Sequence, residues 1–145
     1  MSAQGPGRTV HVLLVEDNEV DREAVRRAFA QHKIANPIVD AVDGIEALDV
    51  LRGTNGKARL PRPYLILLDI NMPRMNGIEL LRELRADPEL RDSIVFVLTT
   101  SKNDEDKMAA YQANVAGYIA KSEVGAGFMR LVTLLDHYWK VVEFP

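Results

Sequence analysis

Acidic side chains follow two short apolar segments of the chain. Residues 10–15 read VHVLLV and run directly into Glu16 and Asp17, and residues 64–68 read YLILL and end on Asp69. An ionised carboxylate at the tip of a buried strand costs free energy unless a partner neutralises it. If the two segments are neighbouring strands, charges about 4 Å apart repel by roughly 4 kcal/mol at an effective dielectric constant near 20. The three acids therefore indicate a cation site.

The candidate ligands around these acids are all oxygens. The chain has no cysteine, and no histidine lies near these strand ends in the sequence. Hard oxygen ligands suit Mg²⁺, which keeps several waters and often bridges to a phosphoryl group. Thr99 and Lys121 end two further apolar segments. A metal ion, a hydroxyl and an ammonium group around Asp69 would form a phosphoryl-transfer site, with that carboxylate as the acceptor of an acyl phosphate.

Segments of strand length and segments of helical periodicity alternate five times along the chain. The strand segments are continuous apolar runs, which is typical of a parallel sheet covered by helices on both faces. Right-handed crossovers then give a doubly wound α/β fold, in which ligands bind beyond the carboxyl ends of the strands. We expect strands within residues 10–15, 36–42, 64–69, 93–100 and 116–121, and helices within 16–33, 43–51, 77–87, 103–114 and 128–140.

Helical spacing also predicts which side chains of these helices face the sheet. Val20, Val25 and Phe29 recur at helical intervals in the first helix, and Ile45 and Leu48 share one side of the second. We expect these apolar side chains to be buried.

The ordered set of motifs resembles the receiver domain of two-component response regulators. The gaps agree with that family, with 30 residues from Asp69 to Thr99, 19 more to Tyr118 and three more to Lys121. The resemblance covers about residues 10–138. The motifs that carry it are Glu16-Asp17, LLDINMPRMNG at 67–77, VLTT at 97–100 and GYIAK at 117–121.

The resemblance implies a flavodoxin-like (βα)5 fold with strand order 2-1-3-4-5. It also implies a receiver domain over residues 10–140, between a flexible arm at 1–9 and an apolar tail at 141–145. Because no residues remain for an output module, we expect a stand-alone receiver.

The family's metal site can be carried over to this sequence residue by residue. The resemblance implies that Asp69 is the phosphoacceptor and that Asp17 and Asp69 bind Mg²⁺ directly, together with the backbone carbonyl of Asn71. Glu16 would act through a metal-bound water.

The family's phosphoryl-binding and switch residues also have counterparts here. Lys121 would pair with the phosphoryl group, and Thr99 would hydrogen-bond one of its oxygens while Tyr118 turns inward. This movement would reshape the surface formed by the fourth helix, fifth strand and fifth helix, because a new dianion biases a two-state element. Asn71 and Ser101 would tune the rate of dephosphorylation.

The sequence departs from the family pattern directly after Lys121. The family usually has proline there, preceded by a cis peptide bond, but this chain has Ser122. A non-proline cis bond costs roughly 2.5–4 kcal/mol, against about 0.5–1 kcal/mol before proline. We therefore favour a trans bond between Lys121 and Ser122, with the strained cis form as the alternative.

The C-terminal segment carries more apolar surface than one sheet face can cover. Two helical stripes run along it, and an uncovered stripe is the usual mark of an interface. We expect a homodimer through this segment, with contacts from Phe128, Leu131, Leu135, Tyr138, Trp139, Val142 and Phe144.

The expected function is phosphotransfer signalling. The resemblance implies that a sensor histidine kinase phosphorylates Asp69, after which the protein acts by contact or passes the phosphate to a downstream phosphotransfer protein. The segment from residue 97 to residue 123 and the Trp-containing tail are also similar to regulators paired with bacterial phytochromes. Two alternatives stay open: a haloacid-dehalogenase-like phosphatase, although Asn71 stands where its second aspartate is needed, and an unphosphorylated protein-binding module.

The composition of the chain limits which kinds of partner and which cellular compartment we expect. The net charge is −3 with acids and bases mixed, which argues against a dedicated nucleic-acid binder. No apolar run approaches the roughly 18 residues of a membrane span, and the first residues lack the apolar stretch of a signal peptide. Together with the absence of cysteine, these features favour a cytoplasmic protein.

Overall fold

The computed structural model describes residues 9–31, 33–70, 72, 75–100 and 115–121. Five parallel strands form one sheet in the order β2-β1-β3-β4-β5. The predicted doubly wound fold and strand order are therefore confirmed. The strands are β1 (His11–Val15), β2 (Ile38–Ala41), β3 (Tyr64–Asp69), β4 (Ile94–Thr99) and β5 (Gly117–Ala120).

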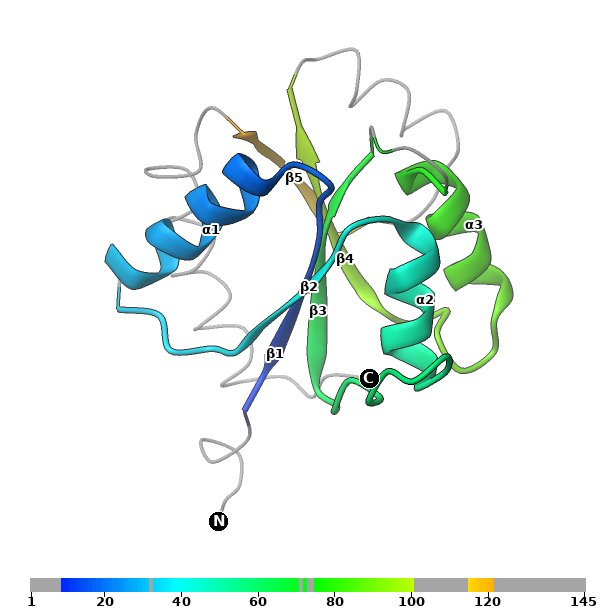
Figure 1. Cartoon of the computed structure of the whole chain (residues 1–145). Helices are drawn as coiled ribbons and strands as arrows, with labels where there is room; N and C mark the ends of the chain where they lie inside the picture. The colour runs from blue at the N-terminus through cyan, green and yellow to red at the C-terminus, as the bar shows by residue number, and fades with distance from the viewer. Residues whose placement is uncertain (1–8, 32, 71, 73–74, 101–114, 122–145) are drawn as a thin grey trace.

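Helices cover both faces of the sheet, with α1 on one side and α2 and α3 together on the other (Figure 1). They are α1 (Glu19–Gln31), α2 (Gly44–Arg52) and α3 (Gly77–Ala86). The two further helices expected at 103–114 and 128–140 lie outside the described residues. Within the described part of the chain, no helix is long and apolar enough to cross a membrane.

Alternate residues of the buried strands supply two separate hydrophobic clusters, because successive side chains of a strand point to opposite faces. On the α1 face, Leu65 and Leu67 of β3 pack in a cluster with Val25 and Phe29. On the other face, Ile66 and Leu68 of β3 pack in a cluster with residues of α2 and α3, including Leu48, Leu51, Leu80, Leu81 and Leu84. The continuous apolar character of β3 thus reflects burial of all six of its residues.

Polar side chains fix where α2 and α3 begin. Asp43 caps α2 by accepting a hydrogen bond from the backbone N–H of Glu46 at 2.8 Å. Asn76 and Glu79 form a reciprocal capping box at the start of α3. Each cap satisfies backbone donors that have no partner within the helix. Because α2 and α3 follow the parallel strands β2 and β3, both helices begin near the carboxyl edge of the sheet.

Three local expectations were wrong at that edge. Val20 is 70% exposed and Ile45 is 41% exposed. Both lie in the first turn of their helix, next to the end of the sheet, where no strand residue covers them. The first helix also begins at Glu19 rather than at Glu16, because Asn18 accepts a hydrogen bond from the backbone N–H of Asp21 at 3.0 Å and caps it there.

Candidate functional site

Strand register brings the predicted acids to one edge of the sheet. Val15 of β1 pairs with Leu68 of β3, so the residues that follow them, Glu16 and Asp69, lie side by side. Carboxylate oxygens of Glu16, Asp17 and Asp69 all lie within 4.8 Å of one another. The three carboxylates that the sequence suggested as a cluster therefore form one.

Burial makes this acidic cluster electrostatically costly. Glu16 is 0% exposed and Asp69 is 3% exposed, whereas Asp17 is exposed to solvent. The pKa of Glu16 is raised from 4.5 to about 7, mainly by burial and also by the neighbouring charge of Asp69, while the hydrogen bond from Lys121 opposes this shift. A buried carboxylate whose pKa is raised beside a second buried acid is the electrostatic sign of a site suited to additional positive charge.

Lys121 supplies a cation from the end of β5. Its Nζ lies 2.8 Å from Glu16 Oε2, 2.9 Å from Asp21 Oδ2 and 3.3 Å from Asp69 Oδ2. Burial alone would lower the pKa of Lys121, but hydrogen bonds to Glu16 and Asp21 and the charge of Asp69 raise it above its ordinary value. The ammonium group therefore stays charged at any physiological pH.

Thr99 and Tyr118 occupy different environments near this cluster. Thr99 ends β4 between β3 and β5, and its side chain is 3% exposed. Its hydroxyl reaches the carbonyl oxygen of Ile119 only across 3.5 Å, a long and weak hydrogen bond. Tyr118 is 38% exposed on the edge strand β5. The Thr99 hydroxyl thus lies buried at the end of the strand next to that of Asp69 and makes a weak hydrogen bond, while the Tyr118 side chain is exposed.

Two glycines hold the segment that follows Asp69 against the body of the protein. The N–H of Gly77 donates to the carbonyl of Ile70 at 3.2 Å, and the N–H of Gly44 donates to the carbonyl of Met75 at 3.0 Å. A Cβ atom on Gly77 would lie 2.5 Å from the Cα atom of Ile70 and 3.0 Å from the carbonyl oxygen of Asp69. Gly77 therefore permits the start of α3 to pack against the backbone of the candidate phosphoacceptor.

Asp21 is the residue of this site that sequence reasoning missed. Its carboxylate contacts Lys121 Nζ at 2.9 Å. The available signal was its position in the first turn of α1, directly after the acids that follow β1.

Several predicted residues lie outside the described part of the chain. They are Asn71, Ser101 and Ser122, with the Lys121–Ser122 peptide bond, and the proposed dimer contacts Phe128, Leu131, Leu135, Tyr138, Trp139, Val142 and Phe144.

The donor set fits a hard divalent cation. Among the described residues, the cluster offers carboxylate oxygens only, two of them on buried residues. Such donors favour Mg²⁺ or Mn²⁺ over metals that prefer nitrogen or sulfur ligands. Asp17 and Asp69 would hold the ion directly, with Glu16 beside them.

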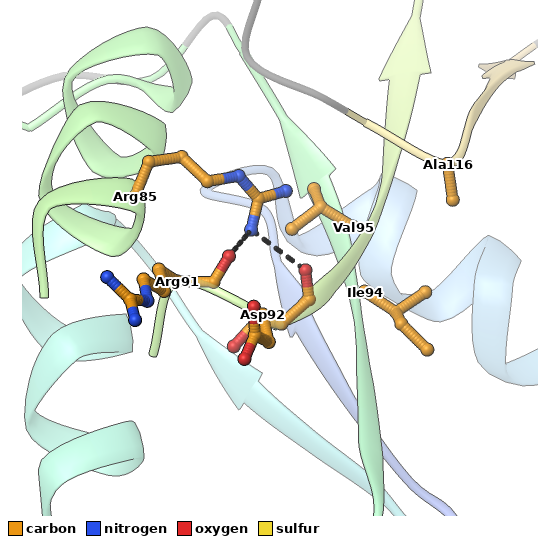
Figure 2. A pocket seen from close by; sticks show the side chains of 7 residues that line it. Arg85, Arg91, Asp92, Ile94, Val95 and Ala116 are labelled. Atoms are coloured by element: carbon orange, nitrogen blue, oxygen red, sulfur yellow. Dashed lines mark hydrogen bonds between the residues drawn. The ribbon is translucent and has the colours of Figure 1, made fainter. Parts of the chain in front are cut away.

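A hollow lies near the opposite edge of the sheet, at the start of β4 (Figure 2). It has a volume of about 330 Å³ and is lined by residues that include Arg85, Asp92 and Ala116. The Nη1 atom of Arg85 donates to the backbone carbonyls of Arg91 at 2.8 Å and Ser93 at 2.9 Å. Arg85 therefore ties the end of α3 to the chain leading into β4, which is a structural role.

The arrangement agrees with a known family over most of the chain. Residues 12–132 match the response regulator receiver domain family. The chain is 34% identical over 128 residues to the response regulator Rcp1 from Synechocystis sp., a match that covers 88% of this chain and 87% of Rcp1.

Solved structures agree with the sequence comparison. A two-component response regulator from Legionella pneumophila is 39% identical with a TM-score of 0.77, covering 89% of this chain and 99% of that one. The phosphorylated cyanobacterial phytochrome response regulator RcpA is 34% identical with a TM-score of 0.77, covering 95% and 99%. A Mn²⁺-bound form of Rcp1 is 34% identical with a TM-score of 0.73, covering 94% and 99%. This chain therefore belongs to the response regulator receiver domain family of two-component signalling.

Proposed function

We propose that the chain accepts a phosphoryl group on Asp69 from a sensor histidine kinase, in a reaction that requires Mg²⁺. The observation that carries this proposal is the position of Asp69, a buried carboxylate at 3% exposure that lies 3.3 Å from the ammonium group of Lys121 and within a cluster of two further acids. Such a grouping neutralises a transferring phosphoryl group and positions its acceptor, which accounts for most catalysis of phosphoryl transfer.

The proposed step is an exchange of bonds at phosphorus. A carboxylate oxygen of Asp69 forms a new P–O bond as the P–N bond of the kinase phosphohistidine breaks, and the imidazole nitrogen keeps the bonding electron pair. Asp17 and Asp69 would hold Mg²⁺, which would supply charge neutralisation at the phosphoryl oxygens. Lys121 would donate to another of these oxygens, and the Thr99 hydroxyl would exchange its long 3.5 Å hydrogen bond to Ile119 for a bond to a third.

Phosphorylation of Asp69 would change the structure of β4 and β5, which carry Thr99 and Tyr118. Thr99 pairs in register with Ala120, two residues beyond Tyr118 on β5. We propose that drawing the Thr99 hydroxyl toward a phosphoryl oxygen opens space near β5 that the exposed ring of Tyr118 fills. The outward position of that ring, 38% exposed, is the starting point of such a movement.

The relatives suggest the class of kinase. RcpA is a cyanobacterial phytochrome response regulator, and this chain covers almost all of its length. We propose a phytochrome-type histidine kinase as the partner, with a downstream phosphotransfer protein as an onward acceptor and with dimerisation through residues 128–144. Family membership favours this function over the phosphatase alternative.

The test is phosphorylation of the purified protein. Incubation with acetyl phosphate and Mg²⁺ is expected to add one phosphoryl group, detected by intact-protein mass spectrometry. The addition should disappear in Asp69→Asn and in the presence of EDTA, and the Asp49→Asn variant, which changes an acid of α2 that lies outside the cluster, should behave like the wild type. An unmodified wild-type protein would instead identify an unphosphorylated binding module.

A further inference from the structure

Lys121 has more acidic partners than the proposed phosphotransfer requires. An ammonium group has three donors, and here three carboxylates lie within ion-pair distance of Nζ. The contacts to Glu16 and Asp21 are 2.8 and 2.9 Å, and the contact to Asp69 is the longest at 3.3 Å. The lysine is therefore held most closely by two residues that are not the phosphoacceptor.

The two close partners differ sharply in exposure. The side chain of Glu16 is 0% exposed, while that of Asp21 is 40% exposed. Asp21 lies in the first turn of α1, where its backbone N–H donates to Asn18 Oδ1 at 3.0 Å. The helix cap thus fixes the backbone of Asp21 at the rim of the site, and its carboxylate draws one lysine donor toward solvent.

A phosphoryl group on Asp69 needs one of these lysine donors. Separating Lys121 from Glu16 would leave a buried carboxylate without its cation, which is strongly unfavourable. Separating it from Asp21 leaves a carboxylate that water can solvate, which costs little. The donor held by Asp21 is therefore the one that can transfer to the phosphoryl oxygens.

We propose that Asp21 is a positioning residue that competes with the phosphoryl group for Lys121. In the unphosphorylated protein it retains the ammonium group at the rim, and phosphorylation releases Asp21 to solvent. The charge of Asp21 also opposes the approach of an anionic phosphodonor. This inference rests on the proposed function and adds to it a residue that sets how readily Asp69 is phosphorylated.

The Asp21→Asn variant tests this competition because it keeps the size and one oxygen acceptor but removes the charge. At saturating Mg²⁺, we expect its rate of phosphorylation by acetyl phosphate to rise about three- to fivefold, the range for loss of one partly exposed ion pair. Beryllofluoride, a phosphoryl analogue, should bind it more tightly by a similar factor in ¹⁹F NMR titrations.

Two further variants separate competition from general charge. Glu23→Gln removes one negative charge from an exposed residue of the same helix and should leave the rate unchanged. Asp21→Glu restores the carboxylate and should return the rate toward the wild-type value. Thermal unfolding of all variants checks that α1 remains folded, which the exposure of Asp21 favours.

Each outcome decides a specific point. If the wild-type protein is phosphorylated but Asp21→Asn is phosphorylated no faster than Glu23→Gln, the role of Asp21 is overturned and the proposed function stays intact. Equal acceleration by both substitutions would also overturn it, since net charge would then be the cause. A wild-type protein that takes up neither a phosphoryl group nor beryllofluoride removes the proposed function, and this inference with it.

Discussion

The ammonium nitrogen of Lys121, at the end of β5, lies 3.3 Å from a carboxylate oxygen of Asp69, at the end of β3. The strand between them, β4, ends on Thr99. The side chain of Lys121 therefore spans the end of β4 to contact Asp69. Its ammonium group also competes with any metal ion for the carboxylates of the acidic cluster.

This competition gives the first prediction. Lys121→Met removes a cation from beside Glu16 and Asp69, so Mg²⁺ should bind about two- to tenfold more tightly because more negative charge is left uncompensated. Phosphorylation should fall by about 10²-fold, since the phosphoryl oxygens lose a fixed donor. Calorimetric Mg²⁺ titration and mass spectrometry measure the two effects. If the variant instead lost both Mg²⁺ affinity and phosphorylation, Lys121 would be needed to maintain the structure of the site.

The second prediction concerns the packing of Gly77 against the backbone of Ile70. An added methyl group at Gly77 would meet backbone atoms at 2.5 and 3.0 Å, which cannot move as a side chain can. We expect Gly77→Ala to lower the free energy of unfolding by about 2–3 kcal/mol and to reduce phosphorylation by displacing Asp69.

A second glycine substitution provides the control. Gly56 has nothing within 4 Å of its added Cβ but a φ of 81°, so Gly56→Ala should cost only about 1 kcal/mol of backbone strain and leave phosphorylation unchanged. Urea denaturation measures the free energy of unfolding of both variants. Equal stabilities of Gly77→Ala and the wild type would contradict the close packing.

The third prediction concerns a buried hydrogen bond between the first residue of β3 and the residue that precedes β4. The Tyr64 hydroxyl lies 2.7 Å from the Ser93 hydroxyl, and both residues are about 5% exposed. Tyr64→Phe should lower the free energy of unfolding by about 1–2 kcal/mol, because the Ser93 hydroxyl is left buried without its partner.

Adding Ser93→Ala to Tyr64→Phe removes both polar groups. The double variant should therefore be less destabilised than the sum of the two single variants, with a coupling of about 1 kcal/mol in chemical denaturation. Strict additivity would show that the two hydroxyls do not interact.

The fourth prediction is a pH dependence of stability at Asp87, just after α3. A hydrogen bond from the backbone N–H of Glu89 lowers the pKa of Asp87 below its ordinary value of 3.8, and the guanidinium of Arg52 lowers it further. Because the folded-state pKa is the lower one, the ionised group stabilises the fold above the unfolded-state pKa. This contribution is lost as the pH falls through the folded-state value.

Asp87→Asn should therefore reduce the melting temperature at neutral pH, and its difference from the wild type should shrink steadily below about pH 4. Glu83→Gln changes an exposed acid of α3 and serves as the control. A wild-type advantage that persists undiminished at pH 2 would show that the Asp87 carboxylate stabilises the fold by a route other than its charge.

Much of the fold and of the site can be predicted from the sequence because the sheet is parallel. Apolar runs such as residues 64–68 specify buried strands, and parallel strands end at one edge, so Glu16, Asp69 and Lys121 are brought together by topology alone. The carboxylate cluster and the neighbouring lysine follow from that geometry.

Periodicity predicts less well at the ends of helices. It placed Val20 and Ile45 on buried faces, yet burial depends on whether the sheet extends far enough to cover the first turn of each helix. Asp21 escaped prediction for a related reason, because its contact with Lys121 joins side chains from opposite ends of the described chain. The spacing of apolar residues within one segment shows neither how far the strands extend beside a helix nor which distant side chains come into contact.

The position of Lys121 directly after β5, late in the described chain, has a consequence for biosynthesis. The acids of β1 and β3 leave the ribosome long before the lysine that pairs with Glu16 and Asp69. A nascent chain that stops short of β5 would bury those carboxylates without the protein's own counter-charge, at a cost of several kcal/mol. We therefore expect a chain truncated before β5 to fold less stably than the full-length chain.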